Sequence, residues 1–183
     1  MDKNKESKKF KFYFIIAVIV VVVALILGLL GAGAVKMTGT KNFCIVCHTM
    51  KPMARSYEAD VHGGNNPSGL RVECVYCHLP QTSTLAYLFV KAKTGLHHIY
   101  AESFYNLKKF DWQENRKHRD RFTYDSACLK CHKNLKNATM SNLKAFNGHR
   151  AYFAKTTKQT CVSCHPSAGH KNLGIYLDKM SKK

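Results

Sequence analysis

The stretch Cys44-Ile45-Val46-Cys47-His48-Thr49-Met50 decides how this chain of 183 residues is organised. Eight residues separate it from the end of a long apolar run. Its Cys-x-x-Cys-His pattern occurs four times and uses all eight cysteines, as Cys44/Cys47/His48, Cys74/Cys77/His78, Cys128/Cys131/His132 and Cys161/Cys164/His165. The repetition indicates one kind of site built four times along the chain.

The pattern is typical of covalent haem attachment. Its two thiols add to the two vinyl groups of a haem, and the adjacent histidine binds the iron. Disulfide frameworks and zinc sites also use Cys-x-x-Cys, but neither explains a histidine at the same offset in all four copies. The sequence therefore predicts four covalently attached haem c groups, each with one iron, in an oxidising compartment outside the cytoplasm.

The formal net charge of +18 is large for a chain of this length. Such an excess ordinarily suggests a nucleic acid or an anionic surface as partner. Four haems would bring up to eight propionate carboxylates, which balance nearly half of this charge. Nucleic acid is therefore not an expected partner, whereas an acidic protein or lipid headgroups are compatible with the remaining charge.

The N-terminal segment predicts a membrane anchor. Residues 1–11 carry five lysines, and residues 12–35 carry no charge. As a helix the uncharged run spans about 36 Å, enough for a hydrocarbon core of about 30 Å. The positive-inside rule places the leader in the cytoplasm and residues 36–183 in the periplasm, with the first haem near the membrane. Ala32-Gly33-Ala34 resembles a signal cleavage site, but signal h-regions span only about 7–15 residues, so we favour an uncleaved anchor in the inner membrane.

The region 36–183 shows an internal repeat. The first cysteines of successive motifs are separated by 30, 54 and 33 residues, and His62 and His149 each lie 12 residues before the second motif of a pair. We expect a mainly α-helical domain with much irregular structure, built of two dihaem repeats behind one transmembrane helix. Electron-transfer haems usually carry two axial ligands, and we expect His62, His149 and His170 as distal ligands. The haem that each of them serves is left open.

The segment Thr82–Phe110 predicts one long soluble helix, with Thr82, Ser83 or Thr84 as its N-cap. Lys91 and His98 lie seven residues apart and hence nearly on one face, with Glu102 one turn later. Both a functional cluster and a solvated polar face fit this pattern.

The apolar anchor, the sequence Cys-x-x-Cys-His-x-Met-x-Pro at 44–52 and the spacing of the later motifs resemble the NapC/NirT family of membrane-anchored quinol-oxidising cytochromes. Within this family the chain is most similar to the small subunits that serve cytochrome c nitrite reductases. The resemblance implies a quinol pocket beside the first haem, with Lys91 and His98 as its catalytic residues and Met50 as an axial ligand. Whether His48 or Met50 binds that iron stays open. His98 is a further candidate ligand, a proton acceptor or a group that covers the iron.

The resemblance implies a quinol dehydrogenase. It would oxidise menaquinol or ubiquinol at the first haem and pass electrons to a periplasmic multihaem nitrite reductase. Another periplasmic reductase, for nitrate or trimethylamine-N-oxide, is an alternative partner. An anchored relay that passes electrons between proteins without a quinol site is a second class of function. A haem-based sensor is disfavoured, because the expected cytoplasmic leader, residues 1–11, has no room for a signalling domain.

Overall fold

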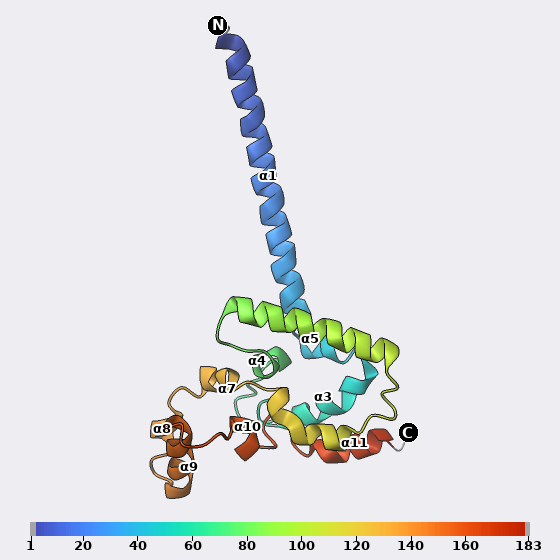
Figure 1. Cartoon of the computed structure of the whole chain (residues 1–183), viewed down its shortest axis with the longest axis vertical. Coiled ribbons are helices and arrows are strands. Elements are labelled where there is room, and N and C mark those ends of the chain that lie inside the picture. Colours follow the sequence, from blue (N-terminus) through green and yellow to red (C-terminus); the bar gives the residue numbers. More distant parts are fainter. Residues whose placement is uncertain (1–2, 182–183) are drawn as a thin grey trace.

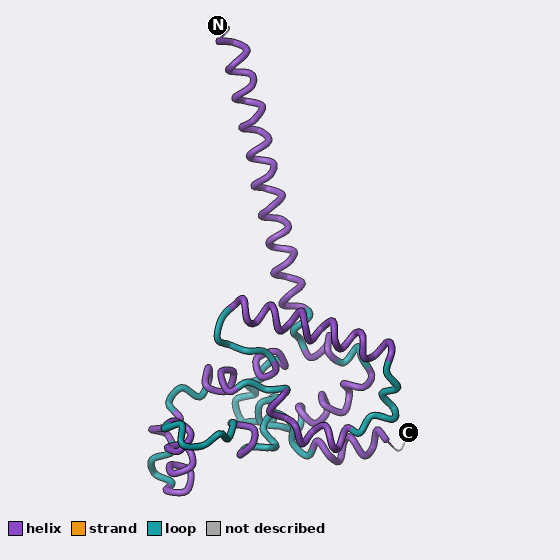
Figure 2. The backbone as a smooth tube through the Cα atoms, in the orientation of Figure 1, coloured by secondary structure: helices purple, strands orange, loops and turns teal. Residues whose placement is uncertain are grey.

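The structure is a computed structural model that describes residues 3–181, and all regular structure in this range is helical (Figure 2). A single antiparallel bridge joins Gly63 to Arg71, and no strand occurs in the described range. The helices are α1 (Lys3–Met37), α2 (Lys41–Cys44), η1 (His48–Met50), α3 (Lys51–Glu58), α4 (Cys74–His78), α5 (Thr84–Phe104), α6 (Trp112–Asn115), η2 (Arg116–Arg121), α7 (Asp125–Cys131), α8 (Leu135–Ala138), α9 (Leu143–Phe153), α10 (Cys161–Cys164) and α11 (Leu173–Ser181). The predicted helical fold class is confirmed.

Helix α1 stands away from the rest of the molecule as one rod (Figure 1). It is 35 residues long, and the part from Ser7 to Met37 is long and apolar enough to cross a membrane. Its apolar side chains point in every direction and are covered by no other helix, which is typical of a helix surrounded by lipid. The helix extends beyond both ends of the predicted span 12–35, because the lysine-rich leader from Lys3 onward is helical too.

Helix α5 runs across the end of α1 that meets the globular part (Figure 1). Its N-cap is Ser83, one of the three caps that the sequence predicted. The Ser83 hydroxyl accepts a hydrogen bond from the Ala86 N–H at 3.2 Å. The prediction that the helix continues to Phe110 was wrong. It ends at Phe104 because Asp111 starts a separate helix, where its carboxylate accepts from the Glu114 N–H at 2.8 Å.

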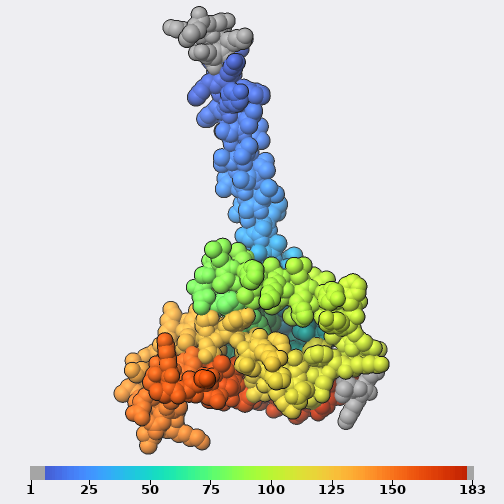
Figure 3. Space-filling model, in the orientation of Figure 1, coloured from blue at the N-terminus to red at the C-terminus, as the bar shows by residue number. Residues whose placement is uncertain are grey.

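The apolar side-chain core is small. Apart from two prolines, Pro52 and Pro80, the buried apolar side chains among the described residues are Leu79, Ala127, Val162 and Leu177. The first three of these four lie within or beside a cysteine motif. The accessible surface is 14,173 Å², against about 8,900 Å² for a compact monomer of this mass. The narrow stalk of α1 and the loosely packed helices below it explain the difference (Figure 3). Side-chain packing therefore stabilises this fold less than it stabilises an ordinary domain of the same length.

Helices α3 and α11 form the best-packed contact between segments far apart in the sequence. Leu177 of α11 is 2% exposed, and Ser56 of α3 is completely buried. The Ser56 hydroxyl donates to the Lys171 carbonyl at 3.1 Å. This contact joins the segment after the first motif to the segment after the fourth. It also fixes His170, whose Nδ1 lies 3.1 Å from the Met53 carbonyl oxygen.

The loop between α3 and α4 is held by its own side chains. A Cβ at Gly63 would lie 1.9 Å from the Tyr57 carbonyl oxygen, so only glycine fits this close approach. The Asn66 side chain accepts from the N–H groups of Ser68 and Leu70, both at 3.1 Å. This glycine-rich segment is compact because its backbone groups are paired.

The packing of α11 on α3 gives a stability prediction. Replacing Leu177 by Ala removes a side chain that is 2% exposed, and we expect the free energy of unfolding to fall by about 2–5 kcal/mol. Ile175→Ala is the matched control, because Ile175 lies on the same helix and is 56% exposed. Denaturant unfolding of the haem-loaded protein, followed by circular dichroism, measures both changes. Equal losses in the two variants would contradict the packing of α11.

Candidate haem and quinol site

Three motif histidines each face a second histidine ring at nearly the same distance, and the sequence neighbours His97 and His98 form a fourth pair at 6.2 Å that contains no motif histidine. An imidazole nitrogen binds a transition metal at about 2 Å, so two imidazoles on opposite sides of one ion have ring centres about 6 Å apart. The observed distances between ring centres are 6.0 Å for His78 and His170, 6.1 Å for His149 and His165, and 6.3 Å for His62 and His132. Each of these three pairs therefore fits one iron, and each contains one motif histidine and one predicted distal histidine.

Hydrogen bonds orient several of these rings. A histidine that binds a metal through one nitrogen usually donates its other N–H to a carboxylate or a carbonyl group. Here the acceptors of Nδ1 are Asp60 Oδ1 for His62 at 2.8 Å, the Phe122 carbonyl for His78 at 2.6 Å and the Met53 carbonyl for His170 at 3.1 Å. In all three rings Nε2 is left for the iron.

The environment of His78 and His170 favours the neutral, metal-binding form of imidazole. Loss of hydration lowers the pKa of His170 to about 4, with a further contribution from the neighbouring His78. The same loss of hydration lowers the pKa of His78. His149 has a buried Nδ1 with no hydrogen-bond partner among the described residues. A buried polar atom of this kind is costly unless another group, such as a metal ion, satisfies it.

The pairing does not follow the sequence repeat. His149 faces His165 of the motif that follows it, but His62 faces His132 of the third motif instead of a histidine of the second. The second motif instead pairs through His78 with His170, from the end of the chain. The structure thus assigns a facing motif to each predicted distal histidine, a choice that the sequence left open.

The attachment cysteines are arranged in the order of the sequence. The thiols of Cys44 and Cys74 are hydrogen-bonded to each other, which lowers the pKa of Cys44 to about 7. Cys128 and Cys161 form a matching contact, which lowers the pKa of Cys128 to about 7. Burial, followed by the nearby thiols of the third motif, raises the pKa of Cys77 to about 11. The first motif therefore neighbours the second, the second neighbours the third, and the third neighbours the fourth.

The first motif differs from the other three. His48 is exposed in the short helix η1, and no histidine among the described residues forms a ring pair with it. Met50 ends the same turn, is half-buried and precedes α3 as its N-cap. Among the described residues, the first motif therefore has no facing histidine ring, whereas each of the other three motifs has one.

Helix α5 lies over the first motif. The buried Thr49 donates a hydrogen bond from Oγ1 to Glu102 Oε1, which joins the motif to the last turn of α5. The Glu102 carboxylate raises the pKa of Cys47, after the larger effect of burial on that thiol. Loss of hydration lowers the pKa of Lys91, although the nearby Cys44 opposes this change. Lys91 and Glu102 therefore lie beside the two attachment cysteines of the same motif.

His98 lies two turns after Lys91 and one turn before Glu102 on α5, but it is exposed, whereas Lys91 and Glu102 are half-buried. Loss of hydration lowers its pKa, the neighbouring His97 and His78 lower it further, and Glu102 opposes them. A lowered pKa keeps the imidazole neutral near pH 7, and a neutral imidazole accepts protons.

Sequence reasoning missed two residues of this site. Thr49 lies inside the first motif, but its partner Glu102 is 53 residues further along the chain, and no local signal connects the two. Asp60 was detectable, because an aspartate two residues before a histidine commonly bonds to the nearby backbone and side chains. In the structure Asp60 accepts from both the N–H and Nδ1 of His62.

The outer face of α5 is apolar. The four most exposed large apolar side chains of α5 are Leu85 (81%), Phe104 (73%), Phe89 (70%) and Leu96 (70%). They lie opposite the face that carries Lys91, Thr94 and Glu102, which are half-buried. An ordinary surface helix has its polar face outward. The reversed polarity of α5, beside the end of α1, is typical of a helix at a lipid surface.

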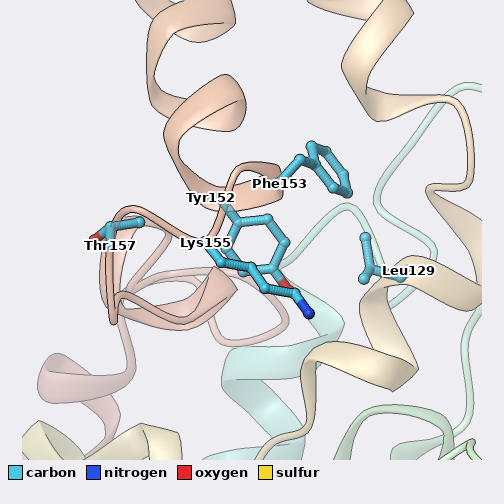
Figure 4. Close-up of a pocket in the computed structure, with 5 residues that line it drawn as sticks. All are labelled: Leu129, Tyr152, Phe153, Lys155 and Thr157. Atoms are coloured by element: carbon cyan, nitrogen blue, oxygen red, sulfur yellow. The ribbon is translucent and has the colours of Figure 1, made fainter.

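Two surface depressions lie away from Lys91 and His98. One of about 320 Å³ is lined by Leu129, Tyr152, Phe153, Lys155 and Thr157, and the Lys155 ammonium group reaches across its apolar floor (Figure 4). The other, of about 290 Å³, lies between the start of α5 and Lys130. Neither depression is the quinol pocket that the sequence predicted.

The cysteine motifs and histidine pairs agree with a comparison against known families. The pattern of the NapC/NirT cytochrome c family, N-terminal region, matches residues 5–174. The chain belongs to the NapC/NirT cytochrome c family. It is therefore a c-type cytochrome of an electron-transfer family, and covalently bound haem c is the cofactor that the family implies. The cysteine and histidine pairs fit that cofactor.

Several relatives are similar to this member of the family. Cytochrome c-type protein TorC of Escherichia coli (strain K12) is 26% identical over 144 residues, which cover 75% of this chain but only 36% of TorC. The chain thus spans about a third of that relative. Cytochrome c-type protein NapC of the same strain is 26% identical over 146 residues, covering 75% of this chain and 71% of NapC. A putative tetraheme cytochrome-c type protein of Allochromatium vinosum is 27% identical over 167 residues, covering 80% of this chain and 87% of the relative.

One solved structure is also similar, the crystal structure of cytochrome c nitrite reductase NrfHA complex bound to the HQNO inhibitor. The matched chain is 23% identical, the TM-score is 0.49, and the match covers 80% of this chain and 86% of the other.

The ring pairs predict the spin state of individual haems. Replacing His170 by Ala removes one imidazole of the His78 pair, and we expect one low-spin haem to become high-spin while all four haems stay attached. Electron paramagnetic resonance measures the spin states, and pyridine haemochrome absorbance measures the haem content. His118→Ala is the control, because the His118 side chain is 45% exposed and belongs to no ring pair of this kind. An unchanged low-spin count in His170→Ala would refute the assignment.

Proposed function

We propose that this chain is a membrane-anchored quinol dehydrogenase. It oxidises menaquinol or ubiquinol beside the first cysteine motif and passes electrons through four haem c groups to a periplasmic reductase. The observation that supports this most is the position of α5. Its inner face sets Lys91 and Glu102 against the two cysteines of the first motif. Its outer face presents exposed apolar side chains beside the membrane-length helix α1.

Quinol oxidation releases two electrons and two protons, so the site needs proton-accepting groups near an electron acceptor. Covalently bound haem c supplies one-electron acceptors when it is present. Lys91 donates a hydrogen bond to a quinol oxygen, and its lowered pKa makes a neutral amine more accessible than in a solvated lysine. His98 accepts a proton, because its lowered pKa keeps the ring neutral beforehand.

Glu102 holds this arrangement in place. Its carboxylate accepts from the buried Thr49 hydroxyl, so the last turn of α5 is fixed to the first motif. The carboxylate also stabilises a protonated His98, because it opposes the effects that lower the pKa of that ring. Glu102 is therefore proposed as a positioning residue that also attracts the released proton.

The ligands follow from the ring pairs. We assign His78 with His170, His132 with His62 and His165 with His149 to the irons of the second, third and fourth motifs. The first motif provides His48 or Met50 on one side of its iron. His98 is a candidate for the other side, as an alternative to its role as proton acceptor. The four cysteine pairs form the thioether bonds.

The membrane arrangement is part of the proposal. Helix α1 crosses the inner membrane once, with residues 1–11 in the cytoplasm, 12–35 in the bilayer and 36–183 as the periplasmic tetrahaem domain. The five lysines before the apolar run support this direction. The proposed partner is a multihaem nitrite reductase, on the sequence resemblance of the first motif. The relatives TorC and NapC keep other periplasmic reductases as alternatives.

A substitution of Lys91 tests the quinol site. In Lys91→Leu we expect quinol-dependent haem reduction to slow by about 10- to 100-fold, because a hydrogen bond from a charged group is lost. Reduction by dithionite and the content of four haems should be unchanged. Lys93→Leu is the matched control, because Lys93 is an exposed lysine on the same helix. Stopped-flow absorbance with a water-soluble menaquinol analogue in proteoliposomes measures the rates. Normal turnover in Lys91→Leu would exclude this lysine from the site.

The same assay separates the dehydrogenase from the anchored relay. A dehydrogenase is reduced directly by the menaquinol analogue, with no second protein present. If the wild-type protein accepts electrons only from another reduced protein, the relay function is correct and the quinol site does not exist.

The orientation can be measured independently. Protease added to spheroplasts should digest the tetrahaem domain while an epitope tag before Met1 stays protected, because the proposed leader lies in the cytoplasm. N-terminal sequencing of the purified protein should begin within the leader. A mature protein that begins after Ala34 would show a cleaved signal peptide instead of an anchor.

A further inference from the structure

The charge of the chain is unevenly distributed along the domain. Residues 126–177 contain eight basic side chains and no acidic one. Residues 38–125 contain twelve basic and eight acidic side chains. If the third and fourth motifs each carry a haem, the four propionates leave a net charge of about +4 in residues 126–177. The half of the domain with the last two motifs is therefore the more positive one.

The positive residues are available to a partner. All eight are exposed, and they are Lys130, Lys133, Lys136, Lys144, Arg150, Lys155, Lys158 and Lys171. Asp125, the nearest carboxylate before this segment, is already used, because it accepts hydrogen bonds from the Tyr152 hydroxyl at 2.8 Å and the Cys161 N–H at 2.9 Å. It therefore does little to balance the lysines around α8 and α9.

Helices α8 and α9 project from the body of the domain, on the side opposite the free end of α1 (Figures 1 and 3). They pack on each other and make few contacts with other helices. Helix α9 carries His149, whose ring faces His165 of the last motif. The projecting pair thus combines proximity to the last motif with distance from the proposed membrane. A flat lipid surface in contact with α1 and α5 would not reach it.

The projecting pair also presents apolar side chains among its lysines. Met140 (64% exposed) and Leu143 (74% exposed) lie at the turn between the two helices, next to Lys144. Phe153 lines the depression of about 320 Å³ beside Lys155 (Figure 4). Protein interfaces combine an apolar centre with a polar rim, and a rim of one charge selects partners of the opposite charge.

We propose that Lys136, Lys144 and Lys155, with Met140, Leu143 and Phe153 between them, form an exit face that docks an acidic electron-acceptor protein. The inference rests on the proposed function, because it needs electrons to leave at the last motif. It adds the surface and the chemistry of the partner. Charge attraction accelerates and orients the encounter, and the apolar centre excludes water once the two proteins are in contact.

A charge-reversal pair of variants tests the exit face in the haem-loaded protein. The test variant is Lys136→Glu with Lys144→Glu. The control is Lys108→Glu with Lys109→Glu, an equal change of charge at two exposed lysines of the loop between α5 and α6. The probes are rubredoxin as a small acidic redox protein and mitochondrial cytochrome c as a basic one. Calorimetry at low and high salt measures binding, and stopped-flow absorbance measures electron transfer from the reduced protein.

We expect rubredoxin to bind the wild-type protein more weakly as the salt concentration increases. The test variant should bind rubredoxin about tenfold or more weakly than the wild type, and the control less than about threefold more weakly. Cytochrome c should bind the test variant better than the wild type. Leu143→Ala should weaken rubredoxin binding without changing its salt dependence. Equal losses in test and control variants, or no loss in either, would overturn the exit face.

Two further outcomes are decisive. The menaquinol analogue should reduce the test variant at the wild-type rate, because the substitutions lie away from α5. If the wild type is not reduced by quinol but still binds rubredoxin through Lys136 and Lys144, the proposed function fails and the exit face stands. If anionic nanodiscs protect these lysines from acetylation and neutral nanodiscs do not, the face binds lipid headgroups and the protein-docking proposal is wrong.

Discussion

The facing of histidine rings across distant segments is the constraint on which this fold depends. Two imidazoles that bind one iron from opposite sides have ring centres about 6 Å apart. Three motif histidines meet this geometry, at 6.0, 6.1 and 6.3 Å from a second histidine. With so few buried apolar side chains among the described residues, side-chain packing alone gives little reason for such regular distances. The pairs His62 with His132 and His78 with His170 connect segments that lie far apart in the sequence. Short helices and loops alone would hold these segments together only weakly.

The first motif is the exception. The histidines of the other three motifs face a second histidine, whereas the first motif lies under a helix whose inner face is polar and whose outer face is apolar. Thr49 and Glu102 join that helix to the motif, Lys91 is half-buried on the inner face, and His98 lies nearby with its side chain exposed. A lipid-soluble reductant that enters beside α1 would meet proton-accepting side chains at the end of the path nearest the membrane. The order of the cysteine contacts continues from there to the last motif.

Charge and apolar surface divide the molecule into two functional ends. The end with α1 and α5 has exposed apolar side chains, and residues 12–35 carry no charge. The other end, around α8 and α9, has lysines without acidic neighbours in the sequence and a small apolar centre. This separation suits a protein that takes electrons from a lipid-soluble donor and delivers them to a soluble acceptor. Electrostatic attraction acts over about 8–10 Å in water and so helps a soluble partner more than a lipid-soluble one.

The sequence by itself determined the attachment chemistry, the apolar anchor helix and the helical class, because these follow from local patterns such as Cys-x-x-Cys-His, an uncharged run and helical periodicity. It also singled out His62, His149 and His170, each of which faces a motif histidine in the structure, while their role as iron ligands stays a prediction. Only the tertiary structure decided that His62 faces the third motif and His170 the second, against the apparent repeat. The physical reason is that His170 is held by the packing of α11 on α3 and His62 by its hydrogen bonds to Asp60. The packing of α11 on α3 joins residues through space, and local sequence patterns carry no information about it.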